Sequence, residues 1–324
     1  MERITEYLYV FGTSFNIYLL RGRRPALIEG GLSVLYDPLR KEVEALGVDI
    51  REVEMAFVLH AHVDHIMAFS PLKAAHPYVQ ICGSERARET LLRDRVWRRL
   101  VEVDRHISGR IASESGLPYK GEEPRRLFID RVLQDGEELE IGGNRIRVIY
   151  TPGHSPCAIS LLVNDEVLLV SDSLGGWLIR RRGGLHPNHF YNLQDYLSSI
   201  ERLSRIPSSV LCLGHNGCVK GREKIEEFIG ELREALNEII KEVGEKVRTV
   251  EEFEAFSRDL AERWYVGFMR FFPRDLHFDS TRLLVKRTLA FLGREELLEA
   301  LEARRNKKIG GCHEGDPFQR GQEL

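Results

Sequence analysis

The chain has 324 residues, of which 43% are hydrophobic and 30% are charged, with a net charge of -3. This length and composition predict one or two folded domains with a large core. The small negative charge gives no general attraction to nucleic acid or anionic membranes, so nucleic-acid binding is disfavoured. We find no apolar run near the length of about 18 residues that a membrane span needs and no signal-like start, so we expect a cytoplasmic protein without membrane contact.

Cysteine usage and the charged fraction bear on the surroundings of the protein. Five cysteines are an odd number without framework spacing, which favours reduced thiols in a reducing compartment. A charged fraction of 30% with few Gln and Asn is typical of proteins from hot environments, where ion-pair networks are favoured. The composition therefore points to a thermophilic source and says nothing about a reaction.

The beginning of the chain predicts several strands and one covering helix. Residues 4–11 and 15–20 are strand-like and separated by a turn, which predicts a hairpin, and residues 26–29 continue the sheet. Ser33 can cap a helix whose apolar residues recur on one face, so that this helix packs on the sheet.

A strand-like apolar run then ends in the most informative stretch of the chain, His60-Ala61-His62-Val63-Asp64-His65. Neutral imidazole and carboxylate are the ligands that borderline first-row cations prefer, and alternate residues of an extended chain face the same side. His60 and His62 can therefore face one metal ion, and Asp64 and His65, after a turn, a second. The alternative is a set of hydrogen-bonded structural residues, but four such groups packed together repel or desolvate one another without a cation between them.

Each ion needs further ligands, and three residues at the ends of later strand-like runs can supply them. These residues are His154, which follows the run 146–150, Asp172, which follows 167–170, and His215, which follows 210–213. If these strands lie side by side in one sheet, the ligands gather at one rim, as sites do in layered α/β proteins. A lone histidine at such a place is more often a structural residue, so these assignments depend on the cluster at 60–65.

The stretches between these residues alternate between strand-like and helical patterns. Residues 85–111 are helical and rich in arginine, which favours a solvated face paired with the interleaved acids; the alternative is an anion-recognising wall over the site. Residues 113–126 are predicted to form a loop at the border of the substrate cleft. Residues 174–192 are predicted to be irregular, as a surface loop or as a place for substrate contacts. Further strand-like runs cover 127–133, 138–141 and 159–163.

The part after His215 is predicted to be helical. Residues 222–244 follow the helix period closely, and Thr249-Val250-Glu251-Glu252 matches a capping box that opens a second helix. Two more helices are predicted over 281–292 and 295–305. The aromatic residues Trp264, Tyr265, Phe268, Phe271 and Phe272 favour core packing or a homodimer interface over a lid on the active site.

These patterns divide the chain into an α/β domain over residues 1–221, a helical region over 222–305 and a disordered tail over 306–324. The tail has four glycines and no apolar periodicity, which is typical of segments that cannot bury enough surface to fold.

The ordered set of candidate ligands resembles the metallo-β-lactamase superfamily, whose pattern is His-x-His-x-Asp-His followed by a His, an Asp and a His after later strands. The resemblance covers about residues 1–221. It implies an α/β fold, the four-layer αββα sandwich of that superfamily, with the C-terminal helical region appended to it. By resemblance, the first metal ion would be held by His60, His62 and His154, the second by Asp64, His65 and His215, and Asp172 would bridge them.

The resemblance also implies the chemistry of a hydrolase. Two divalent ions about 3.5–4 Å apart lower the pKa of a shared water, which gives a hydroxide nucleophile at working pH. Asp64 would be catalytic as well, because it can orient the hydroxide and later shuttle a proton. Glu29 receives no catalytic role, although acids near this position often belong to the core network of the superfamily. The ligand set favours zinc, with iron and manganese as alternatives.

The substrate is less constrained than the reaction class, because the superfamily cleaves several kinds of bond with nearly the same ligands. Ile66-Met67 stands where many glyoxalase II-like members have Gly-Gly, and Gly175 stands where quorum-quenching lactonases have a tyrosine. Helices after the last ligand are similar to the layout of the quinolone-signal response group, which implies a small-molecule thioester or ester as substrate. The alternatives are a phosphodiesterase or nuclease, and a di-iron redox or binding protein; His62 disfavours the latter, whose relatives usually have Glu there.

Overall fold

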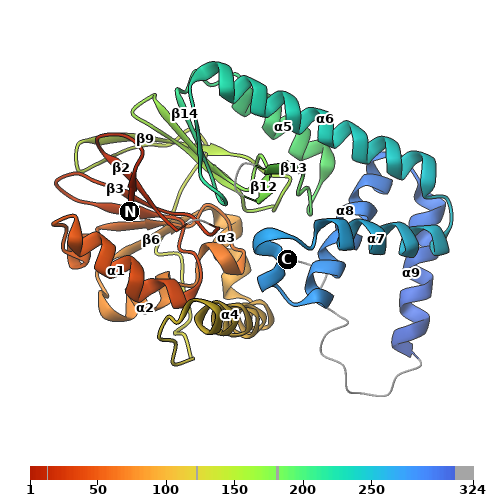
Figure 1. The fold of residues 1–324 in the computed structure, drawn as a ribbon, viewed down its shortest axis with the longest axis horizontal. Coiled ribbons are helices and arrows are strands. Elements are labelled where there is room, and N and C mark those ends of the chain that lie inside the picture. The colour runs from red at the N-terminus through yellow and green to blue at the C-terminus, as the bar shows by residue number, and fades with distance from the viewer. Residues whose placement is uncertain (13, 122, 180–181, 311–324) are drawn as a thin grey trace.

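The computed structural model describes the whole chain except residues 13, 122, 180–181 and 311–324, and it consists of two facing β-sheets with helices on both outer sides (Figure 1). A C-terminal helical region lies beside this two-sheet body. Most of the tail predicted to be disordered falls outside the described residues, and its first part, up to Gly310, belongs to the last helix.

The first sheet has seven strands among the described residues, in sequential order from β1 to β7. Its first four strands pair antiparallel as hairpins, whereas β4 to β7 pair in parallel. The strands are β1 Glu2–Arg3, β2 Leu8–Phe11, β3 Ile17–Leu20, β4 Ala26–Ile28, β5 Met55–Phe57, β6 Gln80–Gly83 and β7 Arg131–Val132. Strands β4 and β5 are apolar throughout and buried throughout, as expected for parallel strands covered on both faces.

The second sheet has the order β15-β14-β11-β10-β9-β8. Its neighbours pair antiparallel except β11 and β14, which run parallel and are joined through a covering helix. The strands are β8 Glu138–Ile141, β9 Asn144–Tyr150, β10 Ile159–Val163, β11 Val167–Ser171, β14 Val210–Leu213 and β15 Cys218–Lys220.

Burial of apolar side chains explains the four layers. Leu20, Phe57 and Leu161 belong to a core between the two sheets. On the far side of the first sheet, helices α1 (Tyr36–Ala45), α2 (Phe69–Ala75), α3 (Glu85–Leu92) and α4 (Asp94–Ser115) cover a second core. On the far side of the second sheet, α5 (Leu193–Ser204) and α6 (Arg222–Lys246) cover a third. The predicted αββα sandwich is confirmed (Figure 1).

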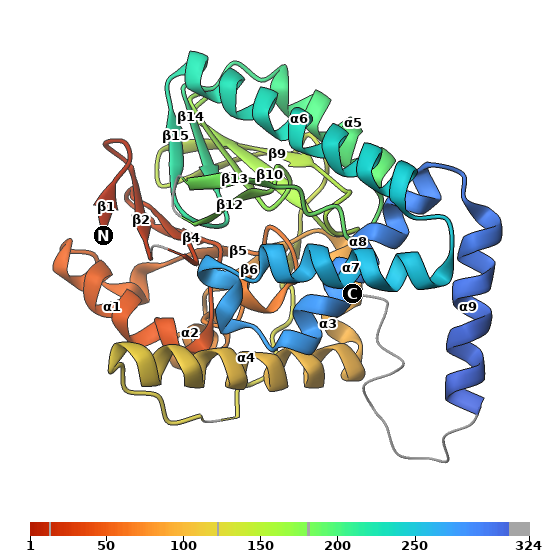
Figure 2. The same ribbon diagram turned by 45° about the vertical axis from the view of Figure 1, so that its right-hand side comes forward.

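The C-terminal region extends from the long helix α6 and has a small core of its own (Figure 2). It contains α7 (Val250–Trp264), the 3-10 helix η4 (Gly267–Phe271), α8 (Arg274–Phe291) and α9 (Glu295–Gly310). The predicted capping box is present: Glu252 N donates to Thr249 Oγ1, and Thr249 N donates to the Glu252 carboxylate. In the described part of the chain, no helix combines the length and the apolar character that a membrane span requires.

Two segments differ from the sequence-based prediction. Residues 174–192 are not irregular, because they contain β12 (Gly176–Ile179) and β13 (Arg182–His186), which pair antiparallel. The glycines and arginines of this segment are not typical of strands, so its sequence does not predict them. Burial of Leu178 and Leu185 stabilises the pairing of the two strands. Of residues 127–133, only 131–132 are in a strand.

Helix boundaries also differ. The arginine-rich segment is divided at Arg93 into α3 and α4, and α4 continues to Ser115, where Gly116 ends it in the left-handed conformation. Helix α8 begins at Arg274, before the predicted start. Ser33 caps no helix with its side chain; its hydroxyl and amide instead donate to the buried Asp104, which ties the chain after β4 to α4.

Candidate metal centre

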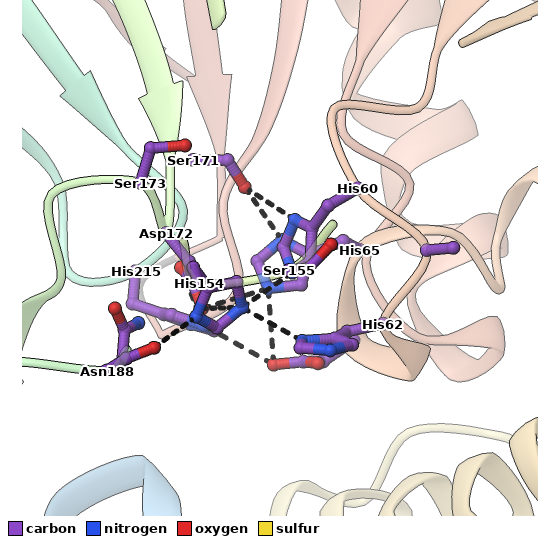
Figure 3. Close-up of polar contacts among 12 residues, drawn as sticks. His60, His62, His65, His154, Ser155, Ser171, Asp172, Ser173, Asn188 and His215 are labelled. Atoms are coloured by element: carbon purple, nitrogen blue, oxygen red, sulfur yellow. Dashed lines mark hydrogen bonds and ion pairs between the residues drawn. The ribbon is translucent and has the colours of Figure 1, made fainter. Parts of the chain in front are cut away.

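The seven predicted ligand residues come from four segments and lie together at one end of the two sheets (Figure 3). The segment 60–65 follows β5 and includes the 3-10 turn Val63–His65, whereas His154, Asp172 and His215 follow β9, β11 and β14. The three strands that precede His154, Asp172 and His215 lie in one sheet, as expected, whereas β5, which precedes the segment 60–65, belongs to the other sheet. The ligand residues meet because the two sheets face each other with these strand ends on the same side.

Three imidazoles form the first candidate group. His154 Nε2 lies 3.2 Å from His60 Nε2 and 2.9 Å from His62 Nδ1. Nitrogens at this spacing face a common point, as they do when each is about 2.0–2.1 Å from one zinc ion. The three side chains therefore form a group that could hold a metal ion.

A second group faces the first across a shared carboxylate. His215 Nε2 and His65 Nε2 lie 3.3 Å and 3.5 Å from Asp64 Oδ2. The carboxylate of Asp172 lies between the groups: it is 3.5 Å from His215 Nε2, 3.7 Å from His65 Nε2 and 3.6 Å from His154 Nε2. One carboxylate thus reaches imidazoles of both groups.

Hydrogen bonds behind the imidazoles hold the rings in place. His154 Nδ1 donates to the carbonyl oxygen of Asn188 at 2.8 Å, and His215 Nδ1 donates to that of Ser14 at 2.6 Å. Each bond places the proton on the outer nitrogen and leaves the lone pair of Nε2 directed into the site. This is the arrangement typical of histidines that ligate metals.

Glu29 has the same kind of role and was not identified as such from the sequence. Its carboxylate binds His65 Nδ1 and accepts a hydrogen bond from Ser171 Oγ at 3.0 Å. Ser171 Oγ also lies 3.1 Å from His60 Nδ1. Both Glu29 and Ser171 have positive φ angles, 67° and 49°, which non-glycine residues adopt only where the surroundings impose them. Glu29 is therefore a positioning residue for His65.

The electrostatics of the site differ between the two groups. Burial alone would lower the pKa of His65 and of His215, but the carboxylates of Glu29 and Asp172 beside them raise both pKa values. Burial lowers the pKa of His60 well below its usual value, and burial together with His154 lowers that of His62 to about 3. Burial alone would raise the pKa of Asp64, but the facing His65 and His215 lower it to about 2. Neutral imidazoles and ionised carboxylates are the forms that bind metals, so His60, His62 and Asp64 need no change of protonation at neutral pH, whereas His65 and His215 release a proton when they bind a metal.

Two buried atoms in the centre support a metal directly. His65 Nε2 and Asp172 Oδ1 have no hydrogen-bond partner among the described residues. An unpaired buried polar atom costs about 1–3 kcal/mol and calls for a partner such as an ion or a water. Since the atoms that surround them are imidazole nitrogens and carboxylate oxygens, the donor set fits a divalent zinc, iron or manganese ion.

Two glycines make room for the close approach of these side chains. A Cβ atom on Gly214 would lie 2.5 Å from Asp172 Oδ1 and 2.8 Å from His65 Cε1. A Cβ atom on Gly153 would lie 2.3 Å from the backbone of Tyr196. Gly153 and Gly214, which directly precede His154 and His215, therefore cannot be replaced by a residue with a side chain without a shift of these neighbours.

The C-terminal region contacts the centre. The Phe268 ring of η4 stacks on His215 with 4.2 Å between ring centroids. Beside the ligand residues lies a cavity of ≈ 170 Å³, and Phe268 and Phe272 both line it. The predicted core packing is present, because Phe268 belongs to the core beside the first sheet and Phe272 and Trp264 pack against it; Phe268 and Phe272 also border the site. The homodimer through these helices stays a prediction.

The role of Glu29 leads to a testable prediction. The variant Glu29→Gln keeps the shape of the side chain but removes the charge behind His65, and we expect about 10- to 100-fold weaker metal affinity, the usual effect of such outer partners. Competition with a chromophoric chelator measures this affinity. The matched control is Glu231→Gln on the exposed surface of α6. Equal metal affinity in the Glu29 variant and the wild type would show that Glu29 does not support a metal ligand.

Fold and site together define the class of protein. The family model of the metallo-beta-lactamase superfamily matches residues 12–215, a range that begins in the first strands and ends at the last predicted ligand. The chain belongs to this superfamily.

Individual relatives are distant. A metallo-beta-lactamase fold-containing protein of Sulfurisphaera tokodaii is 26% identical over 172 residues, which cover 52% of this chain and 62% of the relative, less than two thirds of its length. The acyl-coenzyme A thioesterase MBLAC2 of Homo sapiens is 27% identical over 222 residues, which cover 62% of this chain and 71% of the relative. The crystal structure of a metallo-beta-lactamase family protein from Thermus thermophilus matches with a TM-score of 0.59 and 24% identity, over 91% of this chain and 95% of that one. This last likeness shows the fold alone.

Proposed function

We propose that this chain is a metal-dependent hydrolase that cleaves a thioester or an ester, with two zinc ions as its cofactor. The observation that carries the proposal is the convergence of five imidazoles and two carboxylates on one small space, beside a mainly apolar cavity. The thioesterase name of the human relative agrees with this substrate class.

In this proposal the two groups of side chains hold one ion each. His60, His62 and His154 would hold the first, Asp64, His65 and His215 the second, and Asp172 would be shared. When bound, such a pair of ions supplies a water with a pKa near neutrality and a Lewis acid for the scissile carbonyl oxygen. No side-chain nucleophile is then required.

The chain's own residues orient the reactants and move the proton. In this role the ionised carboxylate of Asp64 accepts a hydrogen bond and then the proton from the attacking water, and it passes that proton to the leaving group. Phe190 lies 5.4 Å from the His154 ring and Phe268 lies 4.2 Å from the His215 ring. These aromatic rings exclude bulk water from the edge of the site, which strengthens the electrostatic interactions inside it.

Two observations favour a neutral ester or thioester over a phosphodiester. Arginines of α3 and α4 are engaged with acids: Arg88 with Glu85 at 2.6 Å, Arg99 with Glu102 at 3.0 Å and Arg105 with Glu123 at 2.8 Å. Arginines that are solvated and paired with acids attract a polyanionic substrate only weakly. The cavity beside the metal centre is lined mainly by apolar side chains, and Arg99 in its lining is paired with Glu102.

A substrate panel tests this proposal. The zinc-loaded protein is assayed with acyl thioesters, simple esters, lactones and bis-p-nitrophenyl phosphate at equal concentrations. We expect a thioester or an ester to be the best substrate, with kcat/KM of about 10⁴ M⁻¹s⁻¹ or higher. If the phosphodiester is the best substrate, or if fully metal-loaded protein cleaves none of the thioesters and esters, the proposed substrate class is wrong.

A further inference from the structure

The cavity beside the metal centre continues away from the ligand residues into an apolar space between two helices. Its near end is lined by His62, Asp64 and His215. Its far walls come from α4, from η4 and the residue after it, and from α8, with the side chains of Leu100, Val103, Phe268, Phe272, Leu276 and Leu283. Helix α4 is distant in sequence from η4 and α8, and it packs against η4. A substrate bonded at the metal centre would therefore have one substituent among apolar side chains.

Helix α8 has two apolar faces, which are buried to different degrees. Leu284, Val285 and Leu289 are fully buried in the core that α7 and α8 share. Leu276 and Leu283, seven residues apart and therefore on one face, are only half-buried and line the cavity. An apolar face left half-buried beside a cavity indicates a place for an apolar part of a ligand.

The polar residues in the wall are neutral or paired. The guanidinium of Arg99 binds Glu102 at 3.0 Å. His277 donates from Nε2 to the carbonyl oxygen of Ala261 at 2.8 Å, and burial lowers its pKa. His186 is buried against the Trp264 ring at 4.3 Å. The wall thus presents no uncompensated charge among the described residues, so the group that enters the cavity is uncharged.

We propose that this cavity binds the acyl chain of the substrate, a medium-length aliphatic chain whose carbonyl lies at the metal centre and whose polar leaving group points to the solvent. This inference rests on the proposed hydrolysis of thioesters or esters. The volume of ≈ 170 Å³ is close to that of an engineered cavity of about 150 Å³ that holds benzene, which is room for about six to eight carbon atoms. Leu276 and Leu283 set the length limit.

A chain-length series tests the inference. Acyl thioesters of N-acetylcysteamine, from acetyl to dodecanoyl, are hydrolysed by the purified protein. Because burying one methylene contributes about 0.8 kcal/mol, kcat/KM is expected to rise about three- to fourfold per methylene. The rise is expected to end at about eight carbons, where the cavity is full. Equal kcat/KM for all chain lengths would overturn the proposal.

Two opposite variants locate the length limit. Leu283→Trp fills the far end and is expected to lower kcat/KM for the octanoyl thioester about tenfold or more relative to the acetyl thioester, the equivalent of about two methylenes. Leu283→Ala enlarges the same end and shifts the preferred chain to greater length, which a misfolded protein would not show. The control is Leu92→Trp on exposed α3, outside the cavity. If neither Leu283 variant changes the preferred length, the chain does not lie between α4 and α8.

A binding measurement separates this inference from the proposed function. The ligand 2-nonanone keeps an octanoyl-like chain and carbonyl but has no bond to hydrolyse, and calorimetry compares it with 2-butanone. Tighter binding of 2-nonanone by about tenfold or more, lost in Leu283→Trp, supports the acyl site even if no thioester is cleaved. Chain-independent hydrolysis together with equal binding of the two ketones would overturn the acyl site and leave the hydrolase proposal standing.

Discussion

The variant Asp172→Ala is expected to lose most of its bound metal and to lower kcat by a factor of about 10² to 10³ or more, the size of effect that follows removal of one preorganised charged group. The carboxylate of Asp172 is within 3.7 Å of imidazoles from both candidate groups. Without this carboxylate, no negative charge lies between the two groups, so two bound cations would repel each other more strongly. Metal content by emission spectroscopy and turnover of the best thioester measure the two effects.

The matched control for this variant is Asp259→Ala, which removes an exposed aspartate of α7 and leaves the centre intact. We expect wild-type metal content and turnover for the control. Full metal content and full turnover in Asp172→Ala would contradict the assignment of the shared carboxylate.

Removal of metal from the wild-type protein is expected to abolish hydrolysis and to lower the melting temperature. Cations that bind only the folded state stabilise it by about 4 kcal/mol when their free concentration is 1,000 times Kd. In a chain of 324 residues this amounts to a shift of about 6 °C. Scanning fluorimetry and an activity assay, before and after dialysis against a chelator and after zinc is added back, measure both effects.

The Asp172→Ala variant is also the control for the chelation experiment. Since it holds little metal at the outset, the same dialysis is expected to change its melting temperature much less than that of the wild type. A wild-type protein that is metal-free by emission spectroscopy but keeps its activity and melting temperature would contradict a metal-dependent hydrolase.

The gathering of the candidate ligands was predictable from the sequence because the pattern is local. Four ligand-type residues within 60–65 cannot be separated by folding, and His154, Asp172 and His215 each follow a strand-like apolar run. Their convergence at one end of the sandwich is observed. The superfamily and the four layers followed from the same residues and are confirmed.

The parts that were not predicted depend on contacts between distant segments. The pairing of strands depends on contacts between them and cannot be read from the residues of one strand. The sequence therefore did not show that β5 lies in a different sheet from β9, β11 and β14. Glu29 is a single acid after a short strand, and only its contact with His65 and its positive φ reveal its role. The strands of 174–192 depend on the burial of two leucines that no periodicity marks.

The cavity is the clearest example of a feature without a local signal. The cavity is lined by Leu100 of α4, by Phe272, which precedes α8, and by Leu283 of α8. Each of these residues fits an ordinary amphipathic helix or turn when its own segment is considered alone. Only the arrangement of the C-terminal region beside the two-sheet body shows that these side chains face a common space.

The most direct test of the central claim is a crystal structure of the zinc-loaded protein with anomalous diffraction data at the zinc edge. We expect two peaks, one among His60, His62 and His154 and one among Asp64, His65 and His215, with the carboxylate of Asp172 in contact with both. A fully loaded crystal with no anomalous peak within bonding distance of these side chains would contradict the account.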